Sequence, residues 1–160
     1  MNTIHTLSQD DWLNWKALRL EALRESPAAI GSGCEDWKDA ADSVWRQQLS
    51  NPDLFHVAAK RDGSWIGMVR GMVDHDGHTV ELISMWVAPS ARGTGAADQL
   101  VGHIEEWGRE RTTELWLSVM PHNERAIALY SRLGFEHSDE VGAPLPDGSA
   151  RELRMVKAFG

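Results

Sequence analysis

The stretch that decides the fold is residues 79–111, TVELISMWVAPSARGTGAADQLVGHIEEWGRER. The run from Val80 to Val87 is almost continuously apolar, which predicts a strand that is buried on both faces. Pro89 ends this strand, because proline has no amide hydrogen for a sheet ladder. After two glycines, apolar residues recur at helical spacing at Ala97, Leu100, Val101 and Ile104. The stretch therefore predicts a strand, a short glycine-bearing loop and an amphipathic helix.

The loop between this strand and this helix has the features of an anion-binding site. The first amides of a helix have no intrahelical partners and lie at the positive end of its dipole. Glycines let the backbone curl so that successive N–H groups converge on an anion, and arginine adds a forked, fixed positive charge. We expect a pyrophosphate-binding loop formed by Arg92, Gly93, Thr94, Gly95, Ala96 and Ala97, with Asp98 at its edge.

Two common phosphate-binding motifs do not fit this loop. A P-loop would end in Gly-Lys-Ser/Thr, and the dinucleotide fingerprint would place glycine or alanine where Asp98 stands. The pattern Arg92-x-x-Gly95-x-Ala97, directly after a strand, instead resembles the Gln/Arg-x-x-Gly-x-Gly/Ala signature of the GNAT superfamily of N-acetyltransferases. In that family the signature binds acetyl-CoA, so the resemblance implies acetyl-CoA as the acyl donor.

A second motif strengthens the resemblance. GNAT enzymes commonly carry Asn-x-x-Ala-x-x-Leu-Tyr-x-x-x-Gly-Phe, and this chain has Asn123, Ala126, Leu129, Tyr130, Gly134 and Phe135 at those places. The resemblance implies that Asn123 contacts the CoA arm and that Tyr130 hydrogen-bonds or protonates the departing sulfur. On their own, the same residues are typical of a helix N-cap and of a core-facing aromatic on an amphipathic helix.

The remaining patterns predict an α/β fold with a mixed sheet in the order β-α-α-β-β-β-α-β-α-β-β. We expect strands at 3–7, 54–61, 64–73, 114–119, after 135 and at 150–159, and further helices ending near 25, at 39–49 and at 123–133. The first helix is expected to bury Leu13, Ala17, Leu20 and Leu23. The order is that of the GNAT fold over residues 1–160, expected as a single domain, and implies two parallel strands splayed around a CoA cleft.

For catalysis, backbone amides around Met85, Trp86 and Val87 are expected to polarise the thioester carbonyl. Some family members place a glutamate base five residues before the motif asparagine, but that place is Ser118 here. Other members use a glutamate on the central strand, which makes Glu81 the candidate general base. A solvated residue near the start of a strand would explain Glu81 equally well. His122 and Glu35 are weaker candidates.

The acceptor site is expected near residues 28–37, where Glu35 and Trp37 could receive a cation by charge and ring face. A solvated acidic face explains Glu35 equally well. The lone Cys34 has no histidine paired with it in sequence, and no histidine pair has metal-ligand spacing, so we expect neither thiol catalysis nor a metal.

Composition limits the partners. The net charge is −8, from 16 Lys and Arg against 24 Asp and Glu, which disfavours nucleic acid. No apolar run approaches the ~18 residues of a membrane span, and the first residues lack a secretory pattern. We therefore expect a cytoplasmic protein without a membrane partner. Homodimers are frequent in the resembled family, so a homodimer is one expected assembly.

These patterns together predict an N-acetyltransferase that moves the acetyl group of acetyl-CoA directly to a primary amine in a ternary complex. The acceptor is left open between an amino acid derivative, a polyamine, an antibiotic and a peptide N-terminus. Two alternatives remain: an acyl-CoA-binding sensor without catalysis, and an enzyme that uses another acyl-CoA.

Overall fold

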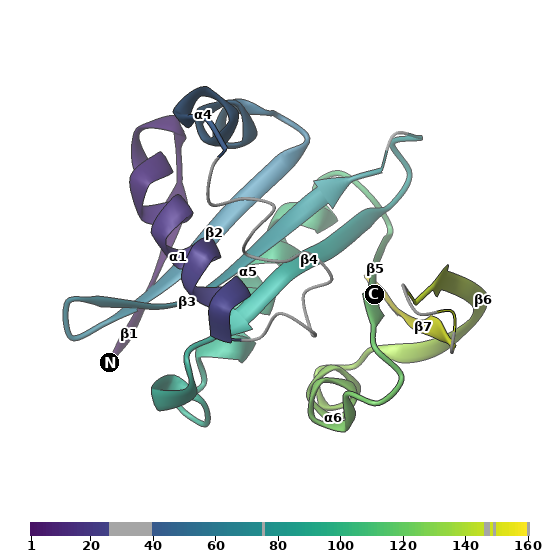
Figure 1. The fold of residues 1–160 in the computed structure, drawn as a ribbon. Coiled ribbons are helices and arrows are strands. Elements are labelled where there is room, and N and C mark those ends of the chain that lie inside the picture. Colours follow the sequence, from purple (N-terminus) through teal and green to yellow (C-terminus); the bar gives the residue numbers. More distant parts are fainter. Residues whose placement is uncertain (26–39, 75, 146–147, 149, 160) are drawn as a thin grey trace.

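The computed structural model describes residues 1–25, 40–74, 76–145, 148 and 150–159. Its elements follow the predicted order (Figure 1). The strands are β1 (Asn2–Leu7), β2 (Leu54–Arg61), β3 (Ser64–Val73), β4 (Val80–Val87), β5 (Glu114–Val119), β6 (Glu136–Pro144) and β7 (Arg151–Ala158). The helices are α1 (Trp12–Glu25), α4 (Asp42–Ser50), α5 (Ala96–Arg109) and α6 (Glu124–Arg132), with 3-10 turns η1 (Gln9–Asp11) and η2 (Pro89–Ala91). The α/β fold class predicted from the sequence is confirmed.

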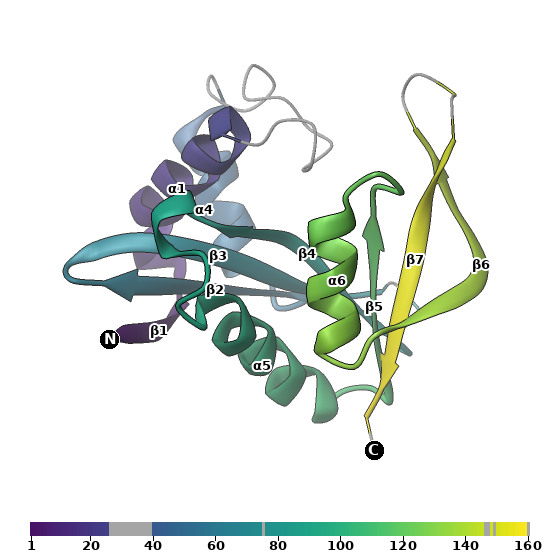
Figure 2. The same cartoon turned by 90° about the horizontal axis from the view of Figure 1, so that it is seen from below.

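The strands form one seven-stranded sheet in the order β1-β2-β3-β4-β5-β7-β6. Neighbours run antiparallel except for β4 and β5, which run parallel. These two pair only at their starts, Val80 with Leu115 and Glu81 with Trp116. Beyond that point they diverge, and α6 lies at the opening (Figure 2). The sheet is therefore split at its parallel pair, as the family resemblance implied.

A β-bulge lies in β4 where the two strands separate. Met68 and Arg70 of β3 lie two residues apart. Their partners on β4, Trp86 and Ile83, lie three residues apart, so β4 carries one extra residue. Within the bulge Ser84 has a φ of 58°, which is uncommon for a residue other than glycine. Its hydroxyl accepts hydrogen bonds from Arg70 Nε at 3.1 Å and Nη2 at 2.8 Å, which hold the bulge in place.

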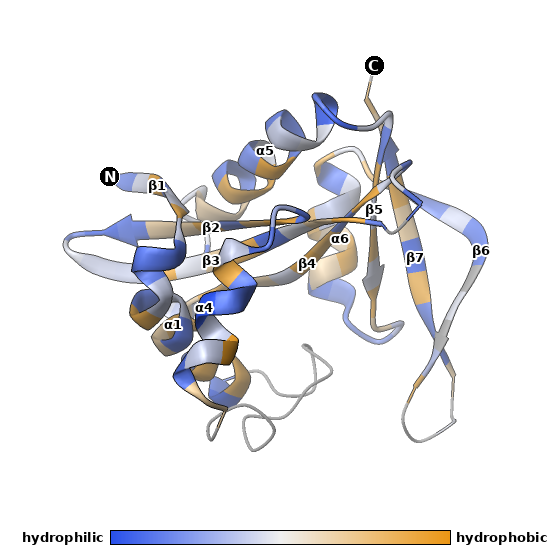
Figure 3. Ribbon diagram, turned by 90° about the horizontal axis from the view of Figure 1, so that it is seen from above, coloured by the Kyte–Doolittle hydropathy of each residue, from blue (hydrophilic) through white to orange (hydrophobic). Residues whose placement is uncertain are grey.

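Helices cover both faces of the sheet (Figure 3). On one face α5 packs so closely on β3 that a Cβ on Gly71 would lie 2.9 Å from the Trp107 ring. That ring also stacks on Phe55 of β2, with centroids 5.1 Å apart. On the opposite face lie α1 and α4, which bury Trp15 and Trp45 completely. The glycine in β3 thus sets the short distance between α5 and the sheet.

The predicted buried face of α1 is only partly correct: Leu23 is buried and Leu20 packs against the core, but the other two predicted residues are exposed. Leu13 is 63% exposed and Ala17 is also exposed. The residues that α1 buries are Trp15, Leu18, Arg19, Ala22 and Leu23. The helix has two apolar stripes, and the one that meets the sheet includes an arginine. A search for apolar periodicity therefore selects the other stripe.

The expectation that β4 is buried on both faces is also wrong. Val80, Leu82 and Trp86 are buried, whereas Ile83 and Met85 are half-buried. The half-buried residues line the gap that opens when β4 leaves β5. An apolar strand beside a cleft thus has the same sequence pattern as a strand covered on both sides.

Candidate active site

A cleft of about 370 Å³ occupies the gap between the splayed strands. Four of the residues predicted for the site meet there: Glu81 and Met85 from β4, Asn123 before α6, and Tyr130 from α6. The remaining lining residues are Arg19, Arg70, Leu82, Ile83, Ser84, Leu117, Ser118, Val119, Met120, Ala126 and Glu152. Residues from α1, β3, β4, β5, α6 and β7 therefore converge on one site.

Glu81 has the electrostatic environment of a base that works near neutral pH. It lies at the start of β4, beside Trp116 of β5. Burial, above all, and then the negative charge of Asp74 raise the pKa of Glu81 to about 7, and Glu152 adds to this while Arg154 opposes it. A carboxylate with this pKa is ionised in a large fraction of molecules at pH 7 and can still take up a proton.

Tyr130 is a buried phenol in the wall of the same cleft, with 7% of its surface exposed. Its ring meets Phe135 edge to face, with centroids 5.7 Å apart, so the motif's two aromatic residues pack together. Burial raises the pKa of Tyr130 above the ordinary phenol value. The hydroxyl therefore keeps its proton at neutral pH and is available as a donor.

Asn123 is the N-cap of α6, as the local pattern indicated. Its Oδ1 accepts a hydrogen bond from the Ala126 amide at 3.2 Å. The cap uses the side-chain oxygen, and the NH2 group of the same side chain takes no part in this hydrogen bond. Since Asn123 also lines the cleft, the capping role is compatible with a contact to a ligand there.

The predicted phosphate loop has the backbone shape that an anion site needs. Gly93 and Gly95 have φ values of 83° and 89°, and Gly95 is the N-cap of α5. A Cβ built on either glycine would meet no atom within 4 Å, so the space beside the loop is open. The first intrahelical bond is donated by Gln99 to the Gly95 oxygen, at 3.1 Å. The amides of residues 96–98 precede it and have no helical acceptor.

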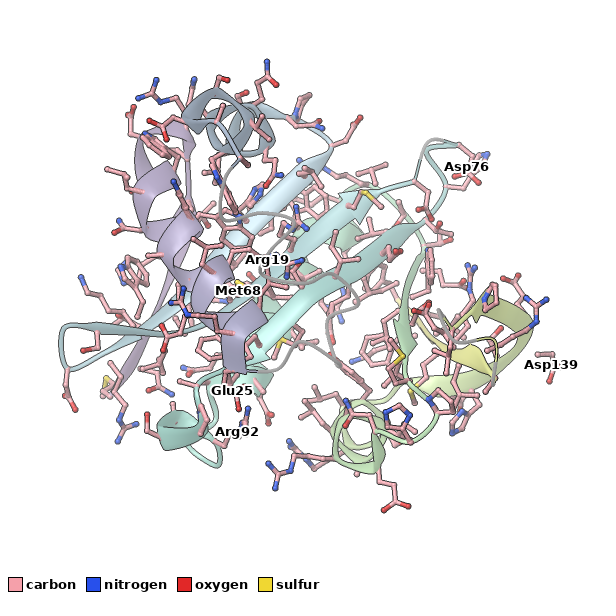
Figure 4. All side chains as sticks on the ribbon, in the orientation of Figure 1. Arg19, Glu25, Met68, Asp76, Arg92 and Asp139 are labelled. Atoms are coloured by element: carbon pink, nitrogen blue, oxygen red, sulfur yellow. The ribbon has the colours of Figure 1, made fainter. Side chains whose placement is uncertain are left out.

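Two charged side chains of this loop are engaged within the protein. Arg92 donates from Nε to the Val87 oxygen and from Nη2 to the Glu25 carboxylate, both at 3.2 Å. Figure 4 shows Glu25 and Arg92 side by side. Glu25 also accepts a hydrogen bond from the Trp86 indole at 2.8 Å and thereby ties α1 to the end of β4. Asp98 makes two 3.0 Å hydrogen bonds to Arg132, which link the start of α5 to α6.

Other predicted site residues lie away from the cleft. Trp86 is buried, and neither its side chain nor Val87 lines the cleft, so only their backbone groups are left for the predicted carbonyl contact. Ser118 does line the cleft, whereas His122 is exposed and does not. Glu35 and Trp37 lie outside the described residues.

Sequence reasoning missed Arg19, Arg70, Ser84 and Glu152. Nothing in a single sequence distinguishes an arginine on the buried stripe of a helix from one on the surface. A bulge in β4 could have been suspected from Ser84, since it interrupts the apolar run.

Within the described ranges, no three His, Cys, Asp or Glu side chains gather in a way that could hold a metal ion. Of the helices in those ranges, none combines the length and apolar composition that a membrane span requires.

A mixed sheet opened at its parallel pair, with a glycine-rich helix start and a cleft that holds a carboxylate and a phenol, is the architecture of an acyltransferase. The model of the acetyltransferase (GNAT) family matches residues 10–135, and the chain belongs to this family.

Solved structures share the fold at low sequence identity. PaiA N-acetyltransferase from Thermoplasma acidophilum, in complex with coenzyme A, is 21% identical with a TM-score of 0.76, and the match covers 99% of both chains. A GNAT-family acetyltransferase from Streptococcus pneumoniae is 19% identical with a TM-score of 0.80, over 99% of this chain and 100% of that one. Ribosomal-protein-alanine N-acetyltransferase from Brucella melitensis is 24% identical with a TM-score of 0.79, over 98% of this chain and 99% of that one.

Proposed function

We propose that this protein transfers the acetyl group of acetyl-CoA to the primary amine of a small molecule, by direct transfer in a ternary complex. The observation that carries the proposal is the meeting of Glu81 and Tyr130 in one cleft, whose helix α6 is tied to the start of α5 by the Asp98–Arg132 pair. One residue is suited to accept a proton at neutral pH and the other to donate one, which are the two proton transfers that amine acylation needs.

The glycine loop and the cleft fit the coenzyme. The amides at the start of α5 that have no helical acceptor, and the open space beside Gly93 and Gly95, suit a diphosphate. Asn123 and Met85, in the wall of the cleft, suit the pantetheine arm. Bound there, acetyl-CoA supplies an acetyl group that is already activated as a thioester.

Each catalytic side chain then has one task. Glu81 takes a proton from the acceptor ammonium or amine, directly or through a water molecule, and so makes the nitrogen lone pair available for attack. Backbone N–H groups of the β4 bulge, near Met85, stabilise negative charge on the carbonyl oxygen. Tyr130 donates its proton or a hydrogen bond to the sulfur as the carbon–sulfur bond breaks.

The test is release of the CoA thiol from acetyl-CoA in the presence of a panel of amines, for wild type and for Tyr130→Phe. We expect turnover with at least one amine and a kcat reduced by about 10²-fold in the variant, the low end of general acid catalysis. The thermal stabilisation that CoA confers should be largely retained in the variant, because the phosphate loop is unchanged.

Other outcomes separate the alternatives. CoA binding without turnover of any amine would contradict the proposal and favour an acyl-CoA sensor. Turnover that is faster with propionyl- or succinyl-CoA than with acetyl-CoA would retain the transferase and contradict the choice of acyl group.

A further inference from the structure

Two arginines lie in the wall of the active-site cleft. Arg19 of α1 is only 6% exposed, and Figure 4 shows it where α1 passes over the sheet. Arg70 of β3 is half-buried beside it. Burial lowers the pKa of Arg19, and burial followed by the charge of Arg19 lowers the pKa of Arg70 to about 10. With a pKa of about 10, Arg70 stays charged at neutral pH.

No described carboxylate pairs with either group. Arg19 Nη1 has no hydrogen-bond partner among the described residues. The side-chain contacts of Arg70 within the described ranges are neutral: the Ser84 hydroxyl and the ring of Trp15, whose centroid is 5.7 Å from the guanidinium. His56 lies nearby, and burial, then Arg70, lower its pKa to about 3, so it is neutral and offsets nothing. An uncompensated buried charge is costly, and an anionic ligand would remove that cost.

The same cleft carries the opposite charge elsewhere on its wall. Glu81 of β4 and Glu152 of β7 line it, and Asp74 is close enough to act on Glu81. The cleft thus offers carboxylates from β4 and β7, and guanidinium groups from α1 and β3. A ligand with one charge of each sign complements both groups.

We propose that the acceptor amine belongs to a small amino acid, whose carboxylate binds Arg19 and Arg70 while its amine faces Glu81. This inference rests on the proposed function and specifies its substrate class. The planar guanidinium fork matches a carboxylate, and Arg19 and Arg70 both line the cleft that would hold it. A volume of about 370 Å³, shared with the end of the coenzyme, fits a small molecule.

The first experiment uses the wild-type protein and matched acceptors. Each of several amino acids is compared with its carboxamide, with the amine that lacks the carboxyl group, and with its phosphonate analogue, by kcat/KM for CoA release. We expect the carboxylate to be preferred over the amide by about tenfold to hundredfold, the effect of one or two charged hydrogen bonds. The amide has the more acidic ammonium, so the basicity of the amine cannot produce this preference.

The second experiment removes the cations one at a time. Arg19→Gln should raise the KM of the amino acid by about tenfold or more and leave the KM of its amide unchanged. Arg19→Lys should restore part of the preference, because it restores the charge. The control is Arg24→Gln, an exposed arginine on the same helix, which should change neither KM. CoA-induced thermal stabilisation reports that each variant is folded.

The outcomes distinguish this inference from the proposed function. Equal kcat/KM for the carboxylate and its amide would overturn the carboxylate site and leave the acetyltransferase in place. Preference for the phosphonate would overturn the assignment to amino acids. If no amine reacts, the proposed function fails. The carboxylate site is then tested by calorimetric titration of the CoA-loaded protein with each amino acid and its carboxamide. Binding of the amino acid but not of its amide would support the site, and no binding would overturn it.

Discussion

Replacing Glu81 by glutamine tests the role of this residue most directly. The change keeps the shape of the side chain and removes both its charge and its ability to take up a proton. If Glu81 is the general base, Glu81→Gln should lower kcat/KM for the amine by about 10²-fold or more at pH 8. Coenzyme binding at the glycine loop should be unaffected.

The wild-type pH profile follows from the pKa of about 7 that burial and the charge of Asp74 give to Glu81. With that pKa, Glu81 is ionised in roughly 10% of molecules at pH 6, about half at pH 7 and roughly 90% at pH 8. Ionisation of Glu81 should therefore raise kcat/KM about ninefold between pH 6 and pH 8. The glutamine variant should lose this rise in kcat/KM and keep only the pH dependence that comes from deprotonation of the acceptor amine.

The same pKa makes a prediction about folding stability with a defined sign. The pKa is higher in the folded state than in the unfolded chain, so the folded protein binds more protons between pH 4.5 and 7. The contribution of Glu81 to the free energy of unfolding therefore falls as pH rises through this range. Above pH 7 the glutamine variant should be more stable than wild type, by on the order of 1–2 kcal/mol after screening by solvent in the open cleft. Below pH 4.5 the two should be equal.

Thermal unfolding and kinetics from pH 4 to 9 measure both effects. Glu136→Gln, which removes an exposed carboxylate on β6, is the control and should change neither the profile nor the stability. A wild-type profile without a limb near pH 7, or a glutamine variant that retains full activity, would refute Glu81 as the base. A variant that is less stable than wild type at pH 8 would refute the account of its environment.

Two further substitutions test the coenzyme loop. Gly95→Val should abolish the thermal stabilisation by CoA, because a φ of 89° is strained for any branched residue. The matched control is Gly102→Ala, in open space within α5, which should preserve the stabilisation by CoA. Asp98→Asn breaks an exposed pair with Arg132, so it should leave the midpoint of chemical denaturation nearly unchanged. The same change should tighten CoA binding at low salt, since it removes a negative charge from the first turn of α5 and releases Arg132; weaker binding would contradict this arrangement.

The fold could be predicted because its signals are local and agree with one another. Pro89, the two glycines and the helical spacing after them fixed the strand–loop–helix unit, and positive φ values at Gly93 and Gly95 confirm the predicted backbone. The Asn123 cap and the Gly134 turn, with a φ of 99°, fixed α6 in the same way. Each of these signals depends on a backbone preference of one residue type, which a single sequence displays directly.

The acceptor side of the cleft could not be predicted, because its residues come together only in the folded chain. Arg19 and Arg70 belong to elements whose sequences would suit a solvated arginine equally well. Their significance arises from burial and from the lack of a described partner for Arg19 Nη1, and neither property has a local pattern. The same reasoning explains the error in α1, where a buried charge concealed the face that packs on the sheet.

Arg70 connects the acceptor end of the cleft with the backbone that would act on the acetyl group. Its two hydrogen bonds hold Ser84 at a φ of 58°, in a bulge one residue before Met85. A residue held in the left-handed region costs about 1–3 kcal/mol, so this conformation depends on those bonds. Arg70→Gln should therefore raise KM for the amino acid and also lower kcat, because the bulge relaxes. Arg19→Gln should raise KM alone, since Arg19 makes no described hydrogen bond to β4. A kcat that is unchanged in Arg70→Gln would show that the bulge does not need this arginine to keep its catalytic shape.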